Sequence, residues 1–134
     1  MKEIVLESKS ENLNTLLLEI EELIEDKRIS IKSKLQLELI IEELFVNICS
    51  YAYEDVGDIK IQYGLLEDPL RIVVTFIDNG IEFNPLSKTA PDLTLEAEQR
   101  DIGGLGLTIV RKNVDKMDYK YENNQNILTI EKVF

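Results

Sequence analysis

Residues 31–53 read IKSKLQLELIIEELFVNICSYAY and carry the longest helical pattern in the chain. Apolar side chains recur on one face of this predicted helix, which is typical of a helix that packs against a core. Its expected core contacts are Leu35, Leu39, Leu44, Ile48 and Ala52. Two carboxylates and an amide stand in the middle of the same pattern, where buried polar groups are costly unless something pairs with them.

Strand patterns flank this helix on both sides. Residues 3–8 alternate charged and apolar side chains, as a half-buried edge strand does. Ser10 is expected to cap a first helix over about 11–27, whose apolar residues also recur at helical spacing. Residues 59–66 and 70–77 then predict two strands joined by a short turn, which makes an antiparallel hairpin.

From about residue 79 the apolar periodicity fades among glycine, proline and acidic residues. A stretch of this length in a compact domain is typical of a functional lid, which we place at about 79–106. A helix over about 106–117 and two strands at 118–122 and 126–133 complete the chain. The order β-α-α-β-β-lid-α-β-β predicts an α/β (α+β) two-layer sandwich with helices on one face.

The composition is that of one ordinary globular domain over residues 1–134, with 44% apolar and 31% charged residues. The 26 acidic residues outnumber the 15 basic ones, so the formal net charge is −11. This charge argues against nucleic acid and anionic membranes as partners, because both bind positive surfaces. The lone Cys49 excludes an internal disulfide, and no apolar stretch approaches the length of a membrane span. We therefore expect a cytoplasmic protein.

Glu43 and Asn47 lie four residues apart, which places them one turn apart on one face of the long helix. A solvated edge of an amphipathic helix would explain this pair. The functional alternative is a cation and general-base pair. In that case Asn47 Oδ1 ligates Mg²⁺, which prefers oxygen ligands, and Glu43 orients or deprotonates a hydroxyl group.

Asp78, Asn79 and Gly80 directly follow an apolar strand pattern. Such Asx-Gly pairs form ordinary turns in many proteins, and this is the simpler interpretation. The functional interpretation is that the Asp78 carboxylate, at the end of a strand, accepts a hydrogen bond from an adenine amino group. Gly80 would then allow the ligand to approach the backbone.

Gly103, Gly104, Leu105 and Gly106 precede a helical pattern. A glycine-rich loop at the positive end of a helix exposes amide N–H groups that bind phosphate. A flexible hinge is the alternative explanation. The pattern is neither a Walker P-loop, because the Lys-Ser/Thr ending is missing, nor a Rossmann loop, because no strand immediately precedes it.

The order and separation of these motifs resemble the N, G1 and G2 boxes of the GHKL ATPase superfamily. Within it, the chain is most similar to the small anti-sigma-factor serine/threonine kinases of the RsbW and SpoIIAB type. The resemblance covers essentially the whole chain. It rests on EELFVNI at residues 42–48, DNGIEFNP at 78–85 and IGGLG at 102–106.

The resemblance implies the Bergerat fold, a mixed, mainly antiparallel sheet with helices on one face and ATP held between sheet, long helix and lid. By this likeness Asn47 would bind Mg²⁺, and Asp78 and Gly80 would hold adenine. The phosphates would be held by Gly103, Gly104, Leu105 and Gly106. Glu43 would act as base toward a serine or threonine of a STAS-domain anti-anti-sigma protein. A sigma factor would be the second partner. The resemblance also implies a homodimer that forms through the N-terminal strand and first helix.

Several positions depart from the family pattern. Glu82 stands where a small residue or proline is usual, and we expect its side chain to point outward. Ile102 stands where an arginine contacts phosphate, so Arg100 is the candidate for that contact. The threonine of the last hairpin has no evident match, since Gln125 falls near its place.

Two functions therefore stay open. One is an anti-sigma regulator with protein serine/threonine kinase activity, which the presence of Glu43 favours. The other is an ATP-dependent partner switch without phosphoryl transfer, for which the departure at Ile102 leaves room. A histidine kinase is disfavoured, because the chain contains no histidine.

Overall fold

The computed structural model describes residues 1–53, 55–85 and 104–134, with the side chains of residues 104–106 excepted. Most of the expected lid thus lies outside the described residues. The elements are β1 (Lys2–Glu7), a short 3-10 turn η1 (Ser10–Asn12), α1 (Leu13–Ile24), α2 (Ile31–Tyr51), β2 (Asp58–Leu66), β3 (Arg71–Asp78), α3 (Gly104–Asn113), β4 (Lys116–Glu122) and β5 (Gln125–Val133).

The five strands form one sheet in the order β1-β2-β3-β5-β4. Each of the four neighbouring pairs is antiparallel, including the hairpin that the sequence predicts between β2 and β3. β1 lies at one edge, as its alternating pattern predicts. In the pairing of β3 with β5, Asp78 stands opposite Asn126, which becomes important below.

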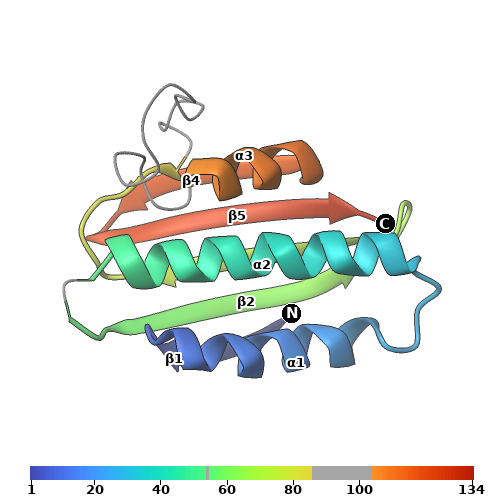
Figure 1. The fold of residues 1–134 in the computed structure, drawn as a ribbon, viewed down its shortest axis with the longest axis horizontal. Helices are drawn as coiled ribbons and strands as arrows, with labels where there is room; N and C mark the ends of the chain where they lie inside the picture. Colours follow the sequence, from blue (N-terminus) through green and yellow to red (C-terminus); the bar gives the residue numbers. More distant parts are fainter. Residues whose placement is uncertain (54, 86–103) are drawn as a thin grey trace.

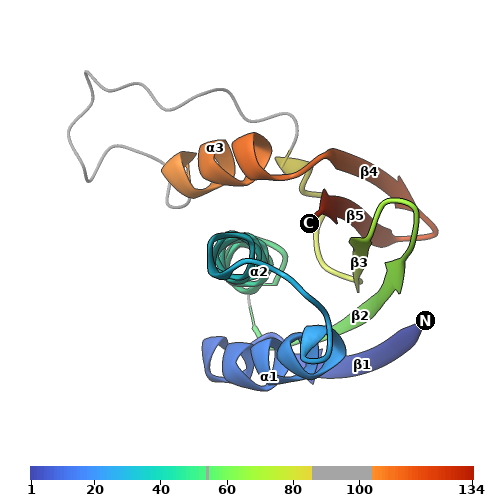
Figure 2. The same ribbon diagram turned by 90° about the vertical axis from the view of Figure 1, so that its right-hand side faces the viewer.

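The three helices lie side by side over one face of this sheet, with α2 between α1 and α3 (Figure 1 and Figure 2). The two-layer sandwich predicted from the sequence is therefore confirmed. None of the helices that the structure describes is long and apolar enough to cross a membrane.

Side chains from both layers fill the core. Because successive strand residues point to opposite faces, every second residue of β3 is buried against the helices. The largest fully buried side chains are Tyr63, Phe45, Phe76, Leu16, Leu37, Ile40, Ile41, Leu44, Ile59, Ile61, Ile72 and Ile130. The long helix α2 contributes five of these, so it is the central support of the helical layer.

Two local predictions for the helices are wrong. Leu35 is 59% exposed, because the buried stripe of α2 runs through Leu37, Ile40, Ile41 and Leu44. Ser10 does not cap α1; it lies in η1, and the helix begins only at Leu13 without a side-chain cap.

The boundary between α3 and β4 also differs from the expected one. We predict a helix to about residue 117, but α3 ends at Asn113, whose carbonyl oxygen accepts a 3.0 Å hydrogen bond from Lys132 Nζ. A cationic side chain at a helix C-terminus stabilises the unpaired carbonyl groups there. Met117, at the end of the expected helix, instead pairs with Ile130 in the sheet.

Candidate nucleotide site

Asp78 is the last residue of β3, and the alternation of the strand turns its side chain toward the helices. The side chain is only 3% exposed. Its Oδ1 atom accepts hydrogen bonds from the Gly80 amide and from Asn126 Nδ2, both at 2.9 Å. No donor among the described residues reaches Oδ2, so this oxygen is available to accept a hydrogen bond from a ligand.

Burial raises the pKa of Asp78, because the low-dielectric surroundings disfavour the charged carboxylate. The hydrogen bonds from Asn126 and Gly80 act in the opposite direction, since they stabilise the charge. Burial is the larger effect, and the pKa remains above the ordinary value for aspartate.

The Asn126 side chain holds Asp78 and its surroundings together. Nδ2 donates to Asp78 Oδ1 and, at 2.8 Å, to the Ile81 carbonyl oxygen. Oδ1 accepts from the Phe83 amide at 3.0 Å and from the Tyr119 hydroxyl at 2.5 Å. Both donors and both acceptor positions of the amide are thus used. One buried side chain connects β3, β4, β5 and the segment that follows β3.

Sequence reasoning did not assign Asn126 to the site. A signal was nevertheless present, because strand alternation puts Asn126 on the same inward face as Leu128 and Ile130. A polar residue in such a row must find buried partners. Gln125, which falls near the place of the family threonine, precedes Asn126 by one residue. Its side chain therefore belongs to the other face of the sheet.

Gly80 brings the backbone after β3 against the C-terminal end of α2. A Cβ atom at Gly80 would lie 2.1 Å from the Ala52 carbonyl oxygen, so no larger residue fits without movement. That oxygen also accepts a 2.8 Å hydrogen bond from the Ile81 amide. Tyr53 adds a second attachment, since its hydroxyl accepts from the Asn79 amide and donates to the Asp58 carbonyl oxygen. The group that lies close to the Gly80 backbone is thus the Ala52 carbonyl of the protein itself.

Asn47 lies on α2 facing the same pocket as Asp78, and it is 4% exposed. Its Nδ2 donates to the Glu43 carbonyl oxygen at 2.6 Å. Its Oδ1 is buried without a hydrogen-bond partner, and it is the one side-chain atom with this property in the described part of the chain. A buried acceptor left unpaired costs about 1–3 kcal/mol, so this atom is a candidate ligand for a cation or a donor.

Glu43 lies one turn before Asn47 and is half-buried. Burial raises the pKa of its carboxyl group, and the neighbouring negative charge of Glu42 raises it further. Glu43 does not line the pocket that Asn47 and Asp78 share. The structure therefore brings two of the predicted residues into one pocket and places Glu43 beside it.

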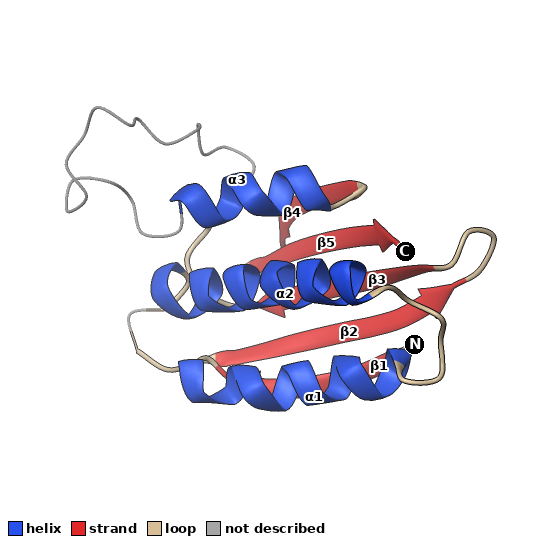
Figure 3. Ribbon diagram, turned by 45° about the vertical axis from the view of Figure 1, so that its right-hand side comes forward, coloured by secondary structure: helices blue, strands red, loops and turns tan. Residues whose placement is uncertain are grey.

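The glycine cluster is only partly described. Gly104, Leu105 and Gly106 form the first turn of α3, two residues earlier than the expected helix start. Figure 3 shows this turn at the same end of the sandwich as the C-terminal end of α2. Gly103 and Arg100, like Ile102, lie outside the described residues. Glu82 is exposed, as expected.

The pocket between α2 and the end of β3 is almost filled by protein. Its volume of about 20 Å³ is on the order of one water molecule. Phe83 and Pro85 line it; the Phe83 ring stacks on Tyr51 at 5.1 Å, and Arg111 Nη2 donates to the Pro85 carbonyl oxygen at 2.7 Å. A nucleobase can enter only if the segment over residues 81–85 moves.

Residues 6–132 match the family model of the histidine kinase-like ATPase domain. The chain belongs to this family. Proteins named serine-protein kinase RsbW, from Bacillus cereus (strain AH187) and Bacillus mycoides (strain KBAB4), are each 36% identical to it over 97 residues. These matches cover 69% of this chain, which spans 59% of the length of each relative.

The same ATPase domain fold occurs in a solved structure, the histidine kinase domain of the blue-light activated histidine kinase from Erythrobacter litoralis EL346. The TM-score is 0.56 at 14% identity, and the match covers 92% of this chain and 60% of that one. At this identity the likeness shows the shared fold alone.

Replacing Gly80 tests the close approach in this ATPase domain. We expect Gly80→Ala to lower the free energy of unfolding by about 1–3 kcal/mol, because the new methyl group overlaps the Ala52 carbonyl oxygen. Gly64→Ala is the control, since the nearest atom to its Cβ would be Cγ of the flexible Met1 side chain, at 3.2 Å, and the nearest backbone atom, Met1 Cα, would be at an ordinary contact distance of 3.6 Å. Urea unfolding measures both, and equal losses would contradict the assigned contact.

Replacing Asn126 tests the pairing with Asp78. A raised pKa in the folded state means that this carboxyl contributes stability at low pH, which is lost as the pH rises through that pKa. Asn126→Ala removes an opposing hydrogen bond and raises the pKa further. Its destabilisation, about 1–3 kcal/mol near neutral pH, should therefore shrink as Asp78 becomes protonated. Urea unfolding from about pH 3 to about pH 7 measures this change.

Thr129→Val is the matched control for that series. It removes a 3.0 Å hydrogen bond to Thr75 in which neither partner titrates. Its cost should be independent of pH over the same range. A pH-independent loss in Asn126→Ala as well would show that the amide does not stabilise the Asp78 carboxylate.

Proposed function

We propose that this domain binds Mg·ATP and transfers the γ-phosphoryl group to a serine or threonine of a STAS-domain protein. In this role it is an anti-sigma factor with serine/threonine kinase activity, and a sigma factor is its second partner. The observation that carries the proposal is the unpaired, buried Asn47 Oδ1 in the same pocket as Asp78. Membership of the ATPase domain family and the likeness to the RsbW kinases support it.

Asp78 and Gly80 are the proposed adenine-binding residues. Oδ2 of Asp78 accepts from the adenine amino group, while Asn126 and the Gly80 amide hold the opposite oxygen in place. The backbone amides of Gly103, Gly104, Leu105 and Gly106 bind the phosphates at the start of α3, where the helix dipole favours anions. Arg100 is the proposed additional phosphate contact.

Asn47 is the proposed protein ligand of Mg²⁺. Its unpaired amide oxygen suits a hard cation that prefers oxygen. Among the residues that the structure describes, no cluster of three or more histidine, cysteine, aspartate or glutamate side chains could hold a metal. Magnesium sites commonly combine few protein ligands with phosphate oxygens and water, so the chain and the nucleotide would share the ion. Bound Mg²⁺ would offset charge on the phosphates.

Glu43 is the proposed general base. In the transfer step the hydroxyl oxygen of the acceptor residue forms a bond to the γ-phosphorus, the bond between that phosphorus and the bridging oxygen of ADP breaks, and the hydroxyl proton passes to Glu43. A carboxylate whose pKa is raised by burial and by Glu42 is a stronger base than one in water. Most of the rate enhancement would come from positioning, as in other phosphoryl transfers.

A second candidate, the partner switch without transfer, is favoured by the closed pocket. Nucleotide entry must displace residues 81–85, whose contacts reach Tyr51 on α2 and Arg111 on α3. Binding would therefore change the surface beside both helices, even if no phosphoryl group moved. A ligand that binds one of two shapes better shifts the population toward that shape.

Asn47→Ala tests the proposed Mg·ATP site. We expect affinity for Mg·ATP to fall at least about tenfold, while ATP in excess chelator binds as weakly to wild type as to the variant. Isothermal titration calorimetry measures both. Asn113→Ala is the control, because Asn113 Nδ2 makes the same contact to the carbonyl oxygen four residues earlier, at 2.8 Å, but on α3. Unchanged Mg·ATP affinity in Asn47→Ala would remove the magnesium assignment.

Glu43→Ala separates the two candidate functions. The assay follows labelled phosphate from ATP to a STAS-domain anti-anti-sigma protein. We expect nucleotide affinity to be retained and the transfer rate to fall about 10²–10⁴-fold, the usual contribution of a general base. Glu42→Ala, which removes the exposed neighbour, should keep most of the rate. ATP-dependent complex formation without any transfer by wild type selects the partner switch instead.

A further inference from the structure

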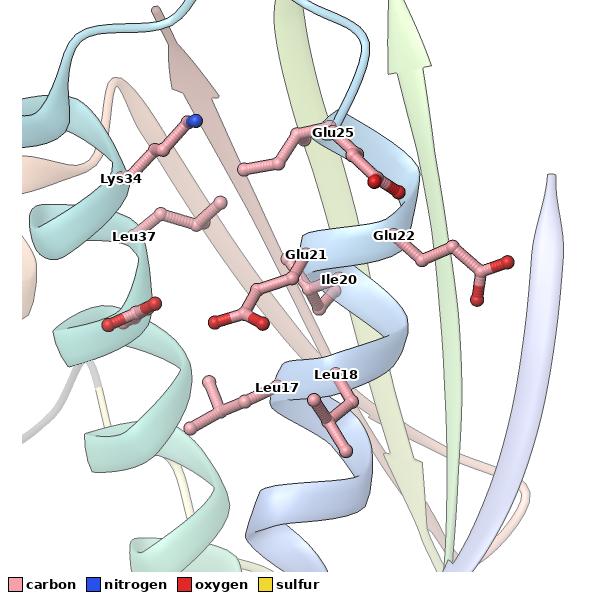
Figure 4. A pocket seen from close by; sticks show the side chains of 10 residues that line it. Leu17, Leu18, Ile20, Glu21, Glu22, Glu25, Lys34 and Leu37 are labelled. Carbon is pink, nitrogen blue, oxygen red and sulfur yellow. The ribbon is translucent and has the colours of Figure 1, made fainter.

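A groove runs between α1 and α2 and shares no lining residue with the nucleotide pocket. Its volume is about 490 Å³. Leu17, Ile20 and Leu37 are among its apolar lining residues, and Glu21, Glu25 and Glu38 supply carboxylates. Figure 4 shows Leu17, Ile20, Glu21 and Glu25 on α1 and Leu37 on the adjacent α2.

The apolar part of the groove is open to solvent. Leu18 lines it and is 56% exposed, and the adjacent Leu17 is only half-buried. Beneath them Ile20 and Leu37 belong to the hydrophobic core. The groove therefore gives solvent access to apolar side chains that a partner could cover, which is typical of protein interaction sites.

In the described part of the chain, no salt bridge joins a lysine or arginine to a carboxylate of the groove. Glu21 points from α1 toward α2 (Figure 4), and Glu38 on α2 lines the same groove. Neither forms a salt bridge with any described residue; Lys34, one turn before Glu38, is not paired with it. Burial, then the hydrogen bond and charge of Glu21, and then the charge of Glu42 raise the pKa of Glu38. The groove lining carries four glutamates, Glu21, Glu22, Glu25 and Glu38, against the single cation of Lys34, so its net charge is negative.

We propose that the groove between α1 and α2 is the docking site for a basic amphipathic helix of another protein. Two packed helices present a groove into which a third helix can place apolar residues at helical spacing. Those residues would cover Leu17 and Leu18, while lysine or arginine side chains on the flanks pair with Glu21 and Glu38. This inference uses no residue of the nucleotide site and stands apart from the proposed kinase activity.

Charge selects this occupant over others. Nucleic acid and anionic lipid would meet the carboxylates with charge of the same sign. A second copy of the chain would bring its own net charge of −11 and the same acidic groove. A basic helix instead supplies cations to a groove that is lined by four glutamates and one lysine, and complementary charge also speeds association.

The test uses the full chain and a fluorescent synthetic helical peptide with leucines on one face and lysines along both flanks. We expect binding that shifts backbone amide NMR signals of α1 and α2. The variant with both Glu21→Gln and Glu38→Gln should bind the peptide at least about tenfold more weakly. Leu18→Ser, which removes an exposed apolar contact, should also weaken binding. A peptide with glutamates in place of the lysines should not bind.

The control variant carries Glu11→Gln and Asp118→Asn, two exposed carboxylates outside the groove. It changes the net charge equally and should bind within about twofold of wild type. Equal weakening in both double variants would assign the binding to overall charge and overturn the proposal. So would absence of binding, or signal changes outside α1 and α2. A dimer of the free chain that protects the same amides would assign the groove to a second copy.

Discussion

The buried amide of Asn126 has two donor and two acceptor positions to satisfy between the sheet and the helices. Four groups from three segments of the chain satisfy them. Its partners include the carboxylate at the end of β3, the backbone after it and the hydroxyl of Tyr119 on β4. Low local dielectric strengthens such a network when it is complete and makes any gap in it expensive. The shape of the pocket wall therefore depends on one side chain opposite Asp78 in the strand register.

Asn47 shows the opposite condition in the same pocket. Its amide nitrogen is paired, but its oxygen is buried without a donor. Native proteins rarely leave such an atom unsatisfied, and the exceptions commonly mark a site for an ion or ligand. Asn126 thus maintains the wall of the pocket, whereas Asn47 keeps an unused acceptor for a ligand. Asp78 combines both conditions, with one oxygen held by the protein and the other free of described donors.

Periodicity predicted the elements well because burial on one face imposes it. The alternation in β3 and the helical spacing in α2 both correspond to observed buried faces. Leu35 is exposed although its spacing from other apolar residues of the helix also suits a buried position. Spacing alone does not show which apolar residues of a helix face the core, because this depends on how the helix packs. The placement of Glu43 one helical turn before Asn47 followed from their spacing of four residues. The role of Asn126 depends on a partner 48 residues away, and local sequence carries no such information.

The helix α2 is a wall of both the nucleotide pocket, through Asn47, and the groove, through Lys34 and Glu38. It is one uninterrupted helix of 21 residues, about 31 Å long at the standard rise per residue. A helix that shifts as a unit changes position along its whole length. Any displacement of α2 would therefore alter both cavities, although they have no lining residue in common.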